Sequence, residues 1–329
     1  MANLRAGVIG LGVMGRNHAR VLNSLTGVEL VGIVEPHIAS LSGEQHAPIF
    51  TSIDELLDTR IDYCFVAVPT DQHLEVGLQL AAAGVHALVE KPLAVDVAEA
   101  ELLAAAFDQA NLIGAVGHIE RYNPSLQQAR ARLASGDLGE LYQVVTRRQG
   151  PFPSRIADVG VVKDLATHDI DLTAWITQRS YESVAAKTAH RTGRIHEDLV
   201  TVVGELQGGL VASHTVNWLS PFKERRTVIS GEKGAFVADT LTADLTFYAN
   251  GVIASTWDDV AVFRGVSEGD VVRYAIPKIE PLRAEHEAFR DAILGQEADI
   301  VTMQQGVATV EVADAILESA RTGETVRIG

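Results

Sequence analysis

The 329-residue sequence contains a single cysteine, Cys64, so no disulfide can form within the chain. Disulfide frameworks belong to oxidising compartments, and a cysteine inside the apolar segment IDYCFVAV is typical of a small buried side chain. No apolar run reaches the roughly 20 residues that a membrane helix needs. The opening apolar run follows only Arg5 and is broken by glycines, unlike an export signal. We therefore expect a cytoplasmic protein with no membrane partner.

Basic residues are in the minority: Lys and Arg number 27 against 43 Asp and Glu, which gives a formal net charge of -16 at pH 7. A nucleic-acid-binding protein needs a basic face, and the short basic clusters of this chain are too brief to form one. Any anionic ligand would have to be held by locally placed cations. The length allows two domains, and 47% hydrophobic with 21% charged residues is ordinary for a globular protein.

A glycine-rich turn follows the first predicted strand, residues 4–9. The spacing Gly10-x-Gly12-x-x-Gly15 encloses Val13 and Met14 and precedes a predicted helix that reaches about residue 24. In a dinucleotide-binding turn the first glycine permits the tight bend, the second admits a pyrophosphate close to the backbone, and the third lets the helix pack on the strand. The free N–H groups of the helix start then favour the phosphates.

An acidic residue, Glu35, ends the next predicted strand, VELVGIVE. The fingerprint expects a carboxylate here to bind the adenosine ribose hydroxyls, and the same carboxylate would repel a ribose phosphate. No arginine nearby offers a phosphate clamp. NAD is therefore the expected cofactor, with NADP disfavoured.

Apolar strands alternate with helices through the first third of the chain. The predicted strands lie at residues 4–9, 28–35, 61–68, 85–90 and 112–118, with helices near 53–57, 73–83 and 97–110 between them. This alternation indicates a parallel sheet covered on both faces. We predict an α/β chain whose N-terminal domain, residues 1–120, is a doubly wound Rossmann sheet.

The pattern changes to short strands and turns in residues 121–329, the predicted substrate-binding and oligomerisation domain. Helices are expected near residues 125–135, 163–177, 283–294 and 303–321, and strands at 199–206, 210–219, 225–231, 235–239, 245–251 and 252–257. Such runs indicate an α+β domain with an open, mainly antiparallel meander. Apolar residues are too frequent in its strands for a sheet with one face exposed to water. We therefore expect that face to meet a second subunit, in a homodimer or homotetramer formed through this sheet.

Two segments carry residues suited to proton and hydroxyl chemistry. Glu90-Lys91-Pro92 ends a predicted parallel strand, at the sheet edge where ligands bind, and the ammonium of Lys91 could hold a substrate hydroxyl. In KDLATHDIDLTAW, a helix would place Asp164, His168 and Trp175 along one side. An imidazole suits removal of a hydroxyl proton near neutral pH. A metal site is disfavoured, because no further residue has ligand spacing.

The motifs GLGVMG, VPTDQHLEVGLQLAAAGVHALVEKP and DLATHDIDLTAW, in this order, resemble the glucose-fructose oxidoreductase/inositol dehydrogenase/rhizopine catabolism (GFO/IDH/MocA) family. The resemblance implies hydride transfer between a sugar or cyclitol carbon and a nicotinamide. It implies His168 as the base, with Lys91 and Asp164 holding substrate hydroxyls. The cofactor residues would be Gly10, Gly12, Val13, Met14, Gly15, Glu35, Pro69, Thr70, His73, Glu90 and Lys91. The chain departs from the usual pattern in having Glu35 instead of Asp, and DVGVVKD instead of a glycine run.

A narrower resemblance lies in GHIERYNP and GPFPSRIADVGVVKD, which look like family members that oxidise the 3-hydroxyl of UDP-N-acetylglucosamine. A nucleotide-sugar substrate needs placed cations and a stacking surface. The candidate substrate-binding residues are His118, Arg121, Asn123, Arg155, Trp218 and Arg225. A myo-inositol or other cyclitol or monosaccharide dehydrogenase is the alternative within the enzyme class. An NAD-sensing binding protein is the alternative outside it, although a sensor has no need of a base.

Overall fold

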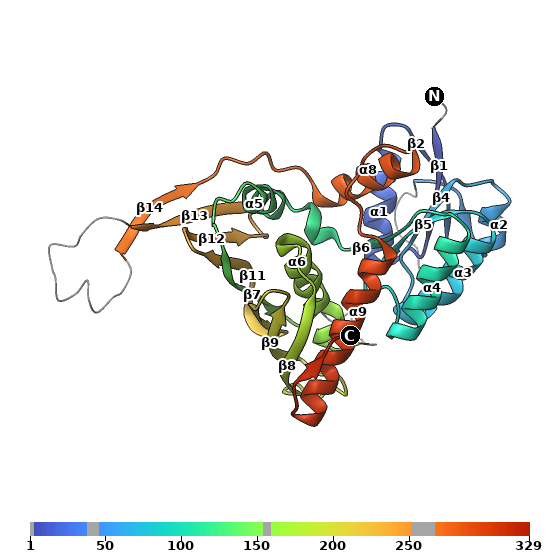
Figure 1. Ribbon diagram of the computed structural model, residues 1–329. Coiled ribbons are helices and arrows are strands. Elements are labelled where there is room, and N and C mark those ends of the chain that lie inside the picture. Colours follow the sequence, from blue (N-terminus) through green and yellow to red (C-terminus); the bar gives the residue numbers. More distant parts are fainter. Residues whose placement is uncertain (1–2, 38–45, 154–158, 252–266) are drawn as a thin grey trace. The chain divides into compact units, whose positions relative to one another are not determined.

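A computed structural model describes residues 3–37, 46–153, 159–251 and 267–329 (Figure 1). The chain divides into two compact units. The first unit comprises Met1–Ile119 and Glu280–Glu311, and the second comprises Glu120–Ile279 and Val312–Gly329. The chain therefore returns to the first unit after building most of the second. The strand predicted for residues 252–257 lies outside the described residues.

The first unit contains a parallel sheet of six strands in the order β3-β2-β1-β4-β5-β6. The strands are β1 (Leu4–Ile9), β2 (Val28–Val34), β3 (Ile49–Phe50), β4 (Tyr63–Val66), β5 (His86–Glu90) and β6 (Gly114–Gly117). The strand order reverses between β1 and β4, and doubly wound sheets bind ligands outside the carboxyl ends at this switch point. The predicted Rossmann-type sheet is confirmed; the two-residue strand β3 was not predicted, because it is too short to show a period.

Helices cover both faces of this sheet (Figure 1). One face carries α1 (Val13–Asn23) and α8 (Pro281–Ile293); the other carries α2 (Ile53–Leu57), α3 (His73–Ala82) and α4 (Val97–Gln109). Each face has its own apolar core: Leu22, Phe65 and Phe289 belong to the first, Leu80 and Leu103 to the second. Since β4 is buried at every position, its uninterrupted apolar sequence is what a sheet covered on both faces requires.

The second unit contains a sheet of nine strands in the order β14-β13-β12-β11-β7-β10-β9-β8-β15. The strands are β7 (Leu141–Pro151), β8 (Tyr181–Ala189), β9 (Leu199–Leu206), β10 (Leu210–Asn217), β11 (Leu219–Gly231), β12 (Gly234–Asp239), β13 (Asp244–Gly251), β14 (Ser267–Arg273) and β15 (Val326–Arg327). The mainly antiparallel sheet is confirmed, but it is not a single meander. Strand β7 lies between β10 and β11 and runs parallel to β10, a long-range pairing that leaves no local sequence pattern.

One face of the second sheet is covered by α5 (Pro124–Ala134), α6 (Thr167–Thr177) and the C-terminal part of α9 (Met303–Thr322). Leu126, Ile170 and Ile316 from these helices share a core with strand residues such as Val202. Strand β9 alternates between core and exposed positions, as a sheet with only one covered face requires. Val203, at one of the exposed positions of β9, is 53% exposed.

A π-helical turn, Val162–Ala166, leads into α6 where a single helix over residues 163–177 was predicted. The wider turn changes the side-chain register at Asp164, so the simple four-residue helix spacing does not apply between Asp164 and His168. Isolated π turns occur frequently at functional sites. The departure from regular helix thus coincides with the predicted catalytic segment.

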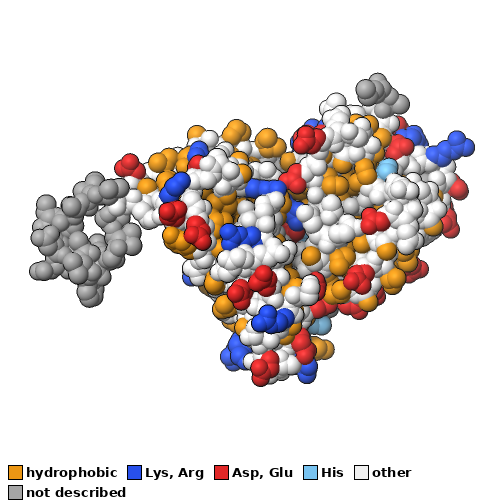
Figure 2. Space-filling view, viewed as in Figure 1, with side chains coloured by type: hydrophobic (Ala, Val, Ile, Leu, Met, Phe, Trp, Pro, Cys, Tyr) orange, Lys and Arg blue, Asp and Glu red, His pale blue; other side chains and the backbone are white. Residues whose placement is uncertain are grey.

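Acidic and basic side chains are interspersed on the face seen in Figure 2, and the described residues there form no extended basic patch. Within the parts of the chain that the structure describes, no helix combines the length and the apolar character needed to cross a membrane.

Candidate active site

The glycine turn after β1 keeps one position open. A Cβ on Gly10, which has φ +89°, would lie 2.6 Å from the carbonyl oxygen of Ala67, and a Cβ on Gly15 would lie 1.9 Å from that of Gly10. The fold itself therefore demands these two glycines. A Cβ on Gly12 would meet no atom within 4 Å. Because packing does not explain Gly12, the open space in front of it fits a ligand that approaches the backbone closely.

Helix α1 begins directly after Gly12, and no side chain caps it. Its first N–H groups thus remain available beside the exposed backbone of the turn, together with the partial positive charge of the helix start. Val13 and Met14 form its first positions, half-exposed or exposed. The open Gly12 and the uncapped helix start together fit the pyrophosphate of a dinucleotide.

The carboxylate of Glu35 lies at the end of β2, close to the same turn. It accepts hydrogen bonds from the backbone N–H of Leu11 and of His37, both at 3.0 Å. These two donors fix the carboxylate at the edge of the first half of the sheet, where the ribose of an adenosine binds in this fold. The observed position fits NAD and opposes the extra phosphate of NADP.

The segment after β4 carries Pro69, Thr70 and His73. Thr70 and His73 are buried, and Pro69 is exposed. The ring nitrogens of His73 lie 3.0 Å from the carbonyl oxygen of Pro92 and 3.1 Å from that of Val68. Burial lowers the pKa of His73, so the ring is neutral and donates through one nitrogen at a time. His73 therefore ties the loop after β4 to the loop that carries Lys91.

Strand β5 ends in Glu90, and the half-buried Lys91 follows it. One carboxylate oxygen of Glu90 accepts the N–H of Lys91 at 3.0 Å, and the other lies 3.4 Å from Nε2 of His18. Burial alone would raise the pKa of Glu90, but the His18 contact and the Lys91 charge outweigh it and lower that pKa. The sequence prediction included Glu90 and Lys91 but missed His18.

In the second unit, the π turn holds Asp164, and the first turn of α6 holds His168. Asp164 is 6% exposed, whereas His168 is half-buried. An acid and an imidazole on consecutive turns can bind neighbouring hydroxyl groups and exchange a proton with one of them.

Two buried arginines anchor the first turns of α6. Arg148 of β7 donates to Asp169 at 2.9 Å and to Glu120 at 2.8 Å. Arg121 makes a two-point contact with Asp171, at 2.8 and 2.5 Å. Such planar pairs fix geometry as well as charge. They hold the helix that carries His168 in one orientation.

The two carboxyl groups that share Arg148 have opposite pKa shifts. Burial raises the pKa of Asp169 in spite of Arg148, whereas Arg148 and Thr240 lower the pKa of Glu120 in spite of burial. Sequence reasoning missed Glu120, Arg148 and Asp169 as a group. Arg148 occupies a buried position of β7, and its partner Asp169 lies 21 residues along the chain.

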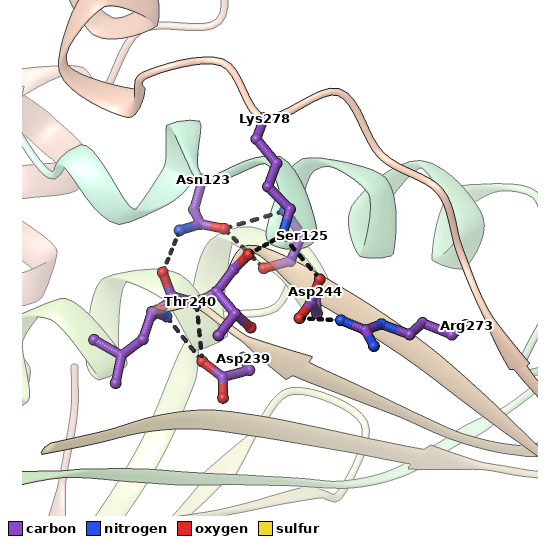
Figure 3. A network of polar contacts seen from close by, with 9 residues as sticks. Asn123, Ser125, Asp239, Thr240, Asp244, Arg273 and Lys278 are labelled. Atoms are coloured by element: carbon purple, nitrogen blue, oxygen red, sulfur yellow. Dashed lines mark hydrogen bonds and ion pairs between the residues drawn. The ribbon is translucent and has the colours of Figure 1, made fainter. Parts of the chain in front are cut away.

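The predicted substrate-binding residues His118, Arg121 and Asn123 follow β6 and are buried. Asn123 is the N-cap of α5: its side chain accepts the N–H of Ser125 at 3.1 Å and donates to the carbonyl of Thr240 at 3.0 Å. Figure 3 shows this link to the turn that also holds Asp239 and Asp244. His118, 1% exposed, and Arg121 are likewise buried. Their contact with substrate stays a prediction.

The other predicted substrate-binding residues differ in exposure. Trp218 is only 3% exposed and packs edge-on against Phe152, so little of its ring remains for stacking on a ligand. Arg225 is half-buried and donates to the carbonyls of Gln149 and Glu224. Arg155 lies outside the described residues.

Comparison with known proteins agrees with this geometry. The family model described as "Oxidoreductase family, NAD-binding Rossmann fold" matches residues 4–118, and the "GFO/IDH/MocA C-terminal domain" matches residues 126–237. The chain belongs to the GFO/IDH/MocA family. It is therefore an NAD-binding oxidoreductase, and the predicted cofactor and enzyme class are confirmed.

The similar proteins within the GFO/IDH/MocA family include dehydrogenases of a nucleotide sugar and of inositol. The UDP-N-acetylglucosamine 3-dehydrogenase of Acidithiobacillus ferrooxidans is 31% identical over 89% of this chain and 90% of its own. An inositol 2-dehydrogenase of Leifsonia xyli is 30% identical over 65% of this chain and 66% of its own. A solved structure of the Acidithiobacillus ferrooxidans enzyme superposes with a TM-score of 0.85 at 27% identity, covering 98% of this chain and 99% of that one.

Proposed function

We propose that the protein is an NAD-dependent dehydrogenase that oxidises a secondary alcohol of a UDP-amino sugar, with the 3-hydroxyl of UDP-N-acetylglucosamine as the best candidate. The observation that carries the proposal is the similarity to a UDP-N-acetylglucosamine 3-dehydrogenase over 89% of the chain. Two local features support it. The backbone N–H of Lys91 is bonded to the Glu90 carboxylate, and the helix that carries His168 is held by the buried pair of Arg148 and Asp169.

The chain's own residues would divide the work. His168 takes the hydroxyl proton, because a neutral imidazole accepts a proton near neutral pH. Lys91 and Asp164 bind the reacting hydroxyl and its neighbour. When bound, NAD accepts the hydride from the same carbon. Loss of proton and of hydride from one carbinol leaves a ketone, so neither loss strands a full charge on the substrate.

A nucleotide-sugar substrate brings a pyrophosphate to a protein with a formal charge of -16. Arg225 is the most suitable described cation, since it is half-buried and has the charged Arg148 nearby. Burial, followed by the Arg148 charge, lowers the pKa of Arg225, although the carboxylates of Asp169, Glu120 and Asp164 act to raise it. Arg225 is thus a partly desolvated cation. Such a group gains from an added anion.

A second candidate function is oxidation of myo-inositol or another free cyclitol or monosaccharide, supported by the similarity to an inositol 2-dehydrogenase. The two candidate functions differ in whether the enzyme binds a uridine diphosphate group on its substrate.

The deciding experiment measures NADH formation with UDP-N-acetylglucosamine and with myo-inositol, in the presence and absence of UDP. We expect turnover of the nucleotide sugar and inhibition by UDP that is competitive with it. Faster turnover of myo-inositol, unaffected by UDP, would overturn the proposal in favour of the second candidate. Oxidation of neither substrate, with NAD still bound, would favour an NAD-sensing binding protein.

A further inference from the structure

Four titratable side chains lie buried together behind Lys91, all in the first unit. They are His18 of α1, Glu90 at the end of β5, and Glu285 and His286 of α8. His18 is 0% exposed, Glu285 and His286 are each 1% exposed, and Glu90 is 9% exposed. The proposed steps of the reaction use none of the two histidines and two acids as proton carriers. Burial of so many ionisable groups is costly unless their contacts are used.

The contacts form a line that ends on Glu90. Nδ1 of His18 lies 2.7 Å from Nε2 of His286, and Nε2 of His18 lies 3.4 Å from the Glu90 carboxylate. A neutral imidazole has one N–H. We assign the His18 N–H to Nε2, where it faces the Glu90 carboxylate at a distance longer than a good hydrogen bond, and Nδ1 of His18 then accepts the N–H of His286. The His18 ring also stacks on Phe65, at 16° between planes, which fixes its orientation.

The row of contacts from His286 through His18 to Glu90 carries one negative charge, on Glu90. Burial lowers the pKa of both His18 and His286, so neither holds a positive charge at neutral pH. Burial and the proximity of Glu90 raise the pKa of Glu285 well above its usual value. Neither carboxyl oxygen of Glu285 has a hydrogen-bond partner among the described residues. The two acids thus have opposite pKa shifts: burial and Glu90 favour the neutral form of Glu285, and the His18 contact and the Lys91 charge favour the carboxylate form of Glu90.

Glu90 lies at the carboxyl end of a parallel strand, where doubly wound sheets bind their cofactors. In a doubly wound sheet each half binds one mononucleotide outside the carboxyl ends of its strands. Glu35 directly follows β2, in the half of the sheet that binds the adenosine. Glu90 is the last residue of β5, in the other half of the sheet. The second half is the one that takes the nicotinamide.

We propose that His18 and His286 are positioning residues of the cofactor site, which hold Glu90 as a carboxylate facing the nicotinamide half and thereby favour NAD+ over NADH. The oxidised nicotinamide ring is a cation and the reduced ring is neutral. A fixed negative charge at this end of the sheet therefore attracts only the oxidised form, and its effect is large because the surroundings are poorly hydrated. A dehydrogenase so arranged binds its oxidant selectively and releases its reduced product.

The test measures the dissociation constants of NAD+ and of NADH by calorimetry, without sugar, so the outcome is independent of the substrate proposed above. Glu90→Gln removes the charge and keeps the shape. We expect it to raise the ratio of the NAD+ constant to the NADH constant about tenfold. His18→Phe, which keeps a ring against Phe65 and loses the donor, should move the ratio in the same direction. The double variant should equal Glu90→Gln alone, because both changes act through one group.

His214→Asn provides the matched control, since it removes an equally buried histidine from the second unit. Its ratio should stay at the wild-type value. Equal weakening of both cofactor forms by His18→Phe would show that the histidine only packs the core and would overturn the positioning role. An unchanged ratio in Glu90→Gln would overturn the whole proposal, and this variant decides the matter even if His18→Phe does not fold.

Discussion

At the scale of single residues, the buried polar groups of the second unit have fixed partners. His214 of β10 lies between the hydroxyl of Thr146 and that of Tyr181, each at 2.8 Å. The site offers a neutral imidazole two hydrogen bonds but offers a charged one no carboxylate. Burial accordingly lowers the pKa of His214 from 6.5 to about 4. The folded state therefore requires the neutral ring.

This environment predicts a stability that depends on pH. The His214 pKa is lower in the folded than in the unfolded protein, so its stabilising contribution is complete above about pH 6.5 and is lost as the pH falls toward 4. A separation of this size corresponds to about 3 kcal/mol of unfolding free energy. Urea unfolding of wild type and His214→Gln from pH 7 to pH 4 measures it: the wild type should lose about that much more than the variant. A constant difference between the two would refute the assignment.

Prediction from sequence could name candidate site residues where these carry their own local motif, and their roles stay predictions. Lys91 follows a strand in a recognisable tripeptide, and the Asp164/His168 pair lies within one short segment. It failed for residues defined by distant partners. His18 contacts His286, 268 residues later, and Arg121 pairs with Asp171 across 50 residues. No periodicity or spacing in the chain encodes such contacts.

At the scale of elements, the strand–turn–helix at the start of the chain combines a structural and a binding requirement. Gly10 and Gly15 are required by close backbone contacts, whereas Gly12 borders open space. The same three-glycine spacing thus contains two glycines that packing requires and one, Gly12, that packing does not require.

Alanine substitutions should separate these requirements. Gly12→Ala, at φ -64°, has an allowed backbone and no clash, so the free energy of unfolding should stay within about 0.5 kcal/mol. Its Cβ would intrude on the pyrophosphate, and the affinity for NAD should fall at least about tenfold. Gly15→Ala should instead lose stability, because its Cβ would overlap the Gly10 carbonyl. Calorimetric NAD binding and thermal unfolding test the pair. Normal NAD affinity in Gly12→Ala would contradict the cradle.

Elements with strong local signals were predicted well, and those fixed by long-range packing were not. Strands β1, β4 and β5 each contain a run of apolar residues and are flanked by turns or helices, so their positions follow from sequence. The π turn Val162–Ala166 was missed because one extra residue in a helical turn leaves the composition unchanged. The place of β7 within its sheet was missed because its partners, β10 and β11, come far later in the chain.

At the scale of the whole molecule, the described helices of the second unit cover one face of its sheet, and none of them covers the other (Figure 1). On the uncovered side Val203 is 53% exposed, Tyr142 is 55% exposed and Val211 is 39% exposed. Apolar side chains grouped on one sheet face are typical of an interface between subunits. The homodimer or homotetramer expected from the sequence stays a prediction, and this face is where we place it.

Sedimentation or light scattering tests that assembly. We expect a mass of two or four chains for the wild type, and a shift toward the monomer for Val203→Lys, which places a charge in the expected interface. Leu102→Lys is the matched control: Leu102 is 59% exposed on α4 of the first unit, and its replacement should leave the mass unchanged. A monomeric wild type would exclude the interface.

The central claim is that this NAD-dependent oxidoreductase removes the substrate's hydroxyl proton through His168. Its most direct test compares wild type with His168→Ala in two measurements: turnover with UDP-N-acetylglucosamine, followed by NADH absorbance, and the dissociation constant for NAD. The account predicts that turnover falls by about 10²- to 10⁴-fold while NAD binding changes less than about twofold. Undiminished turnover in the variant would contradict it.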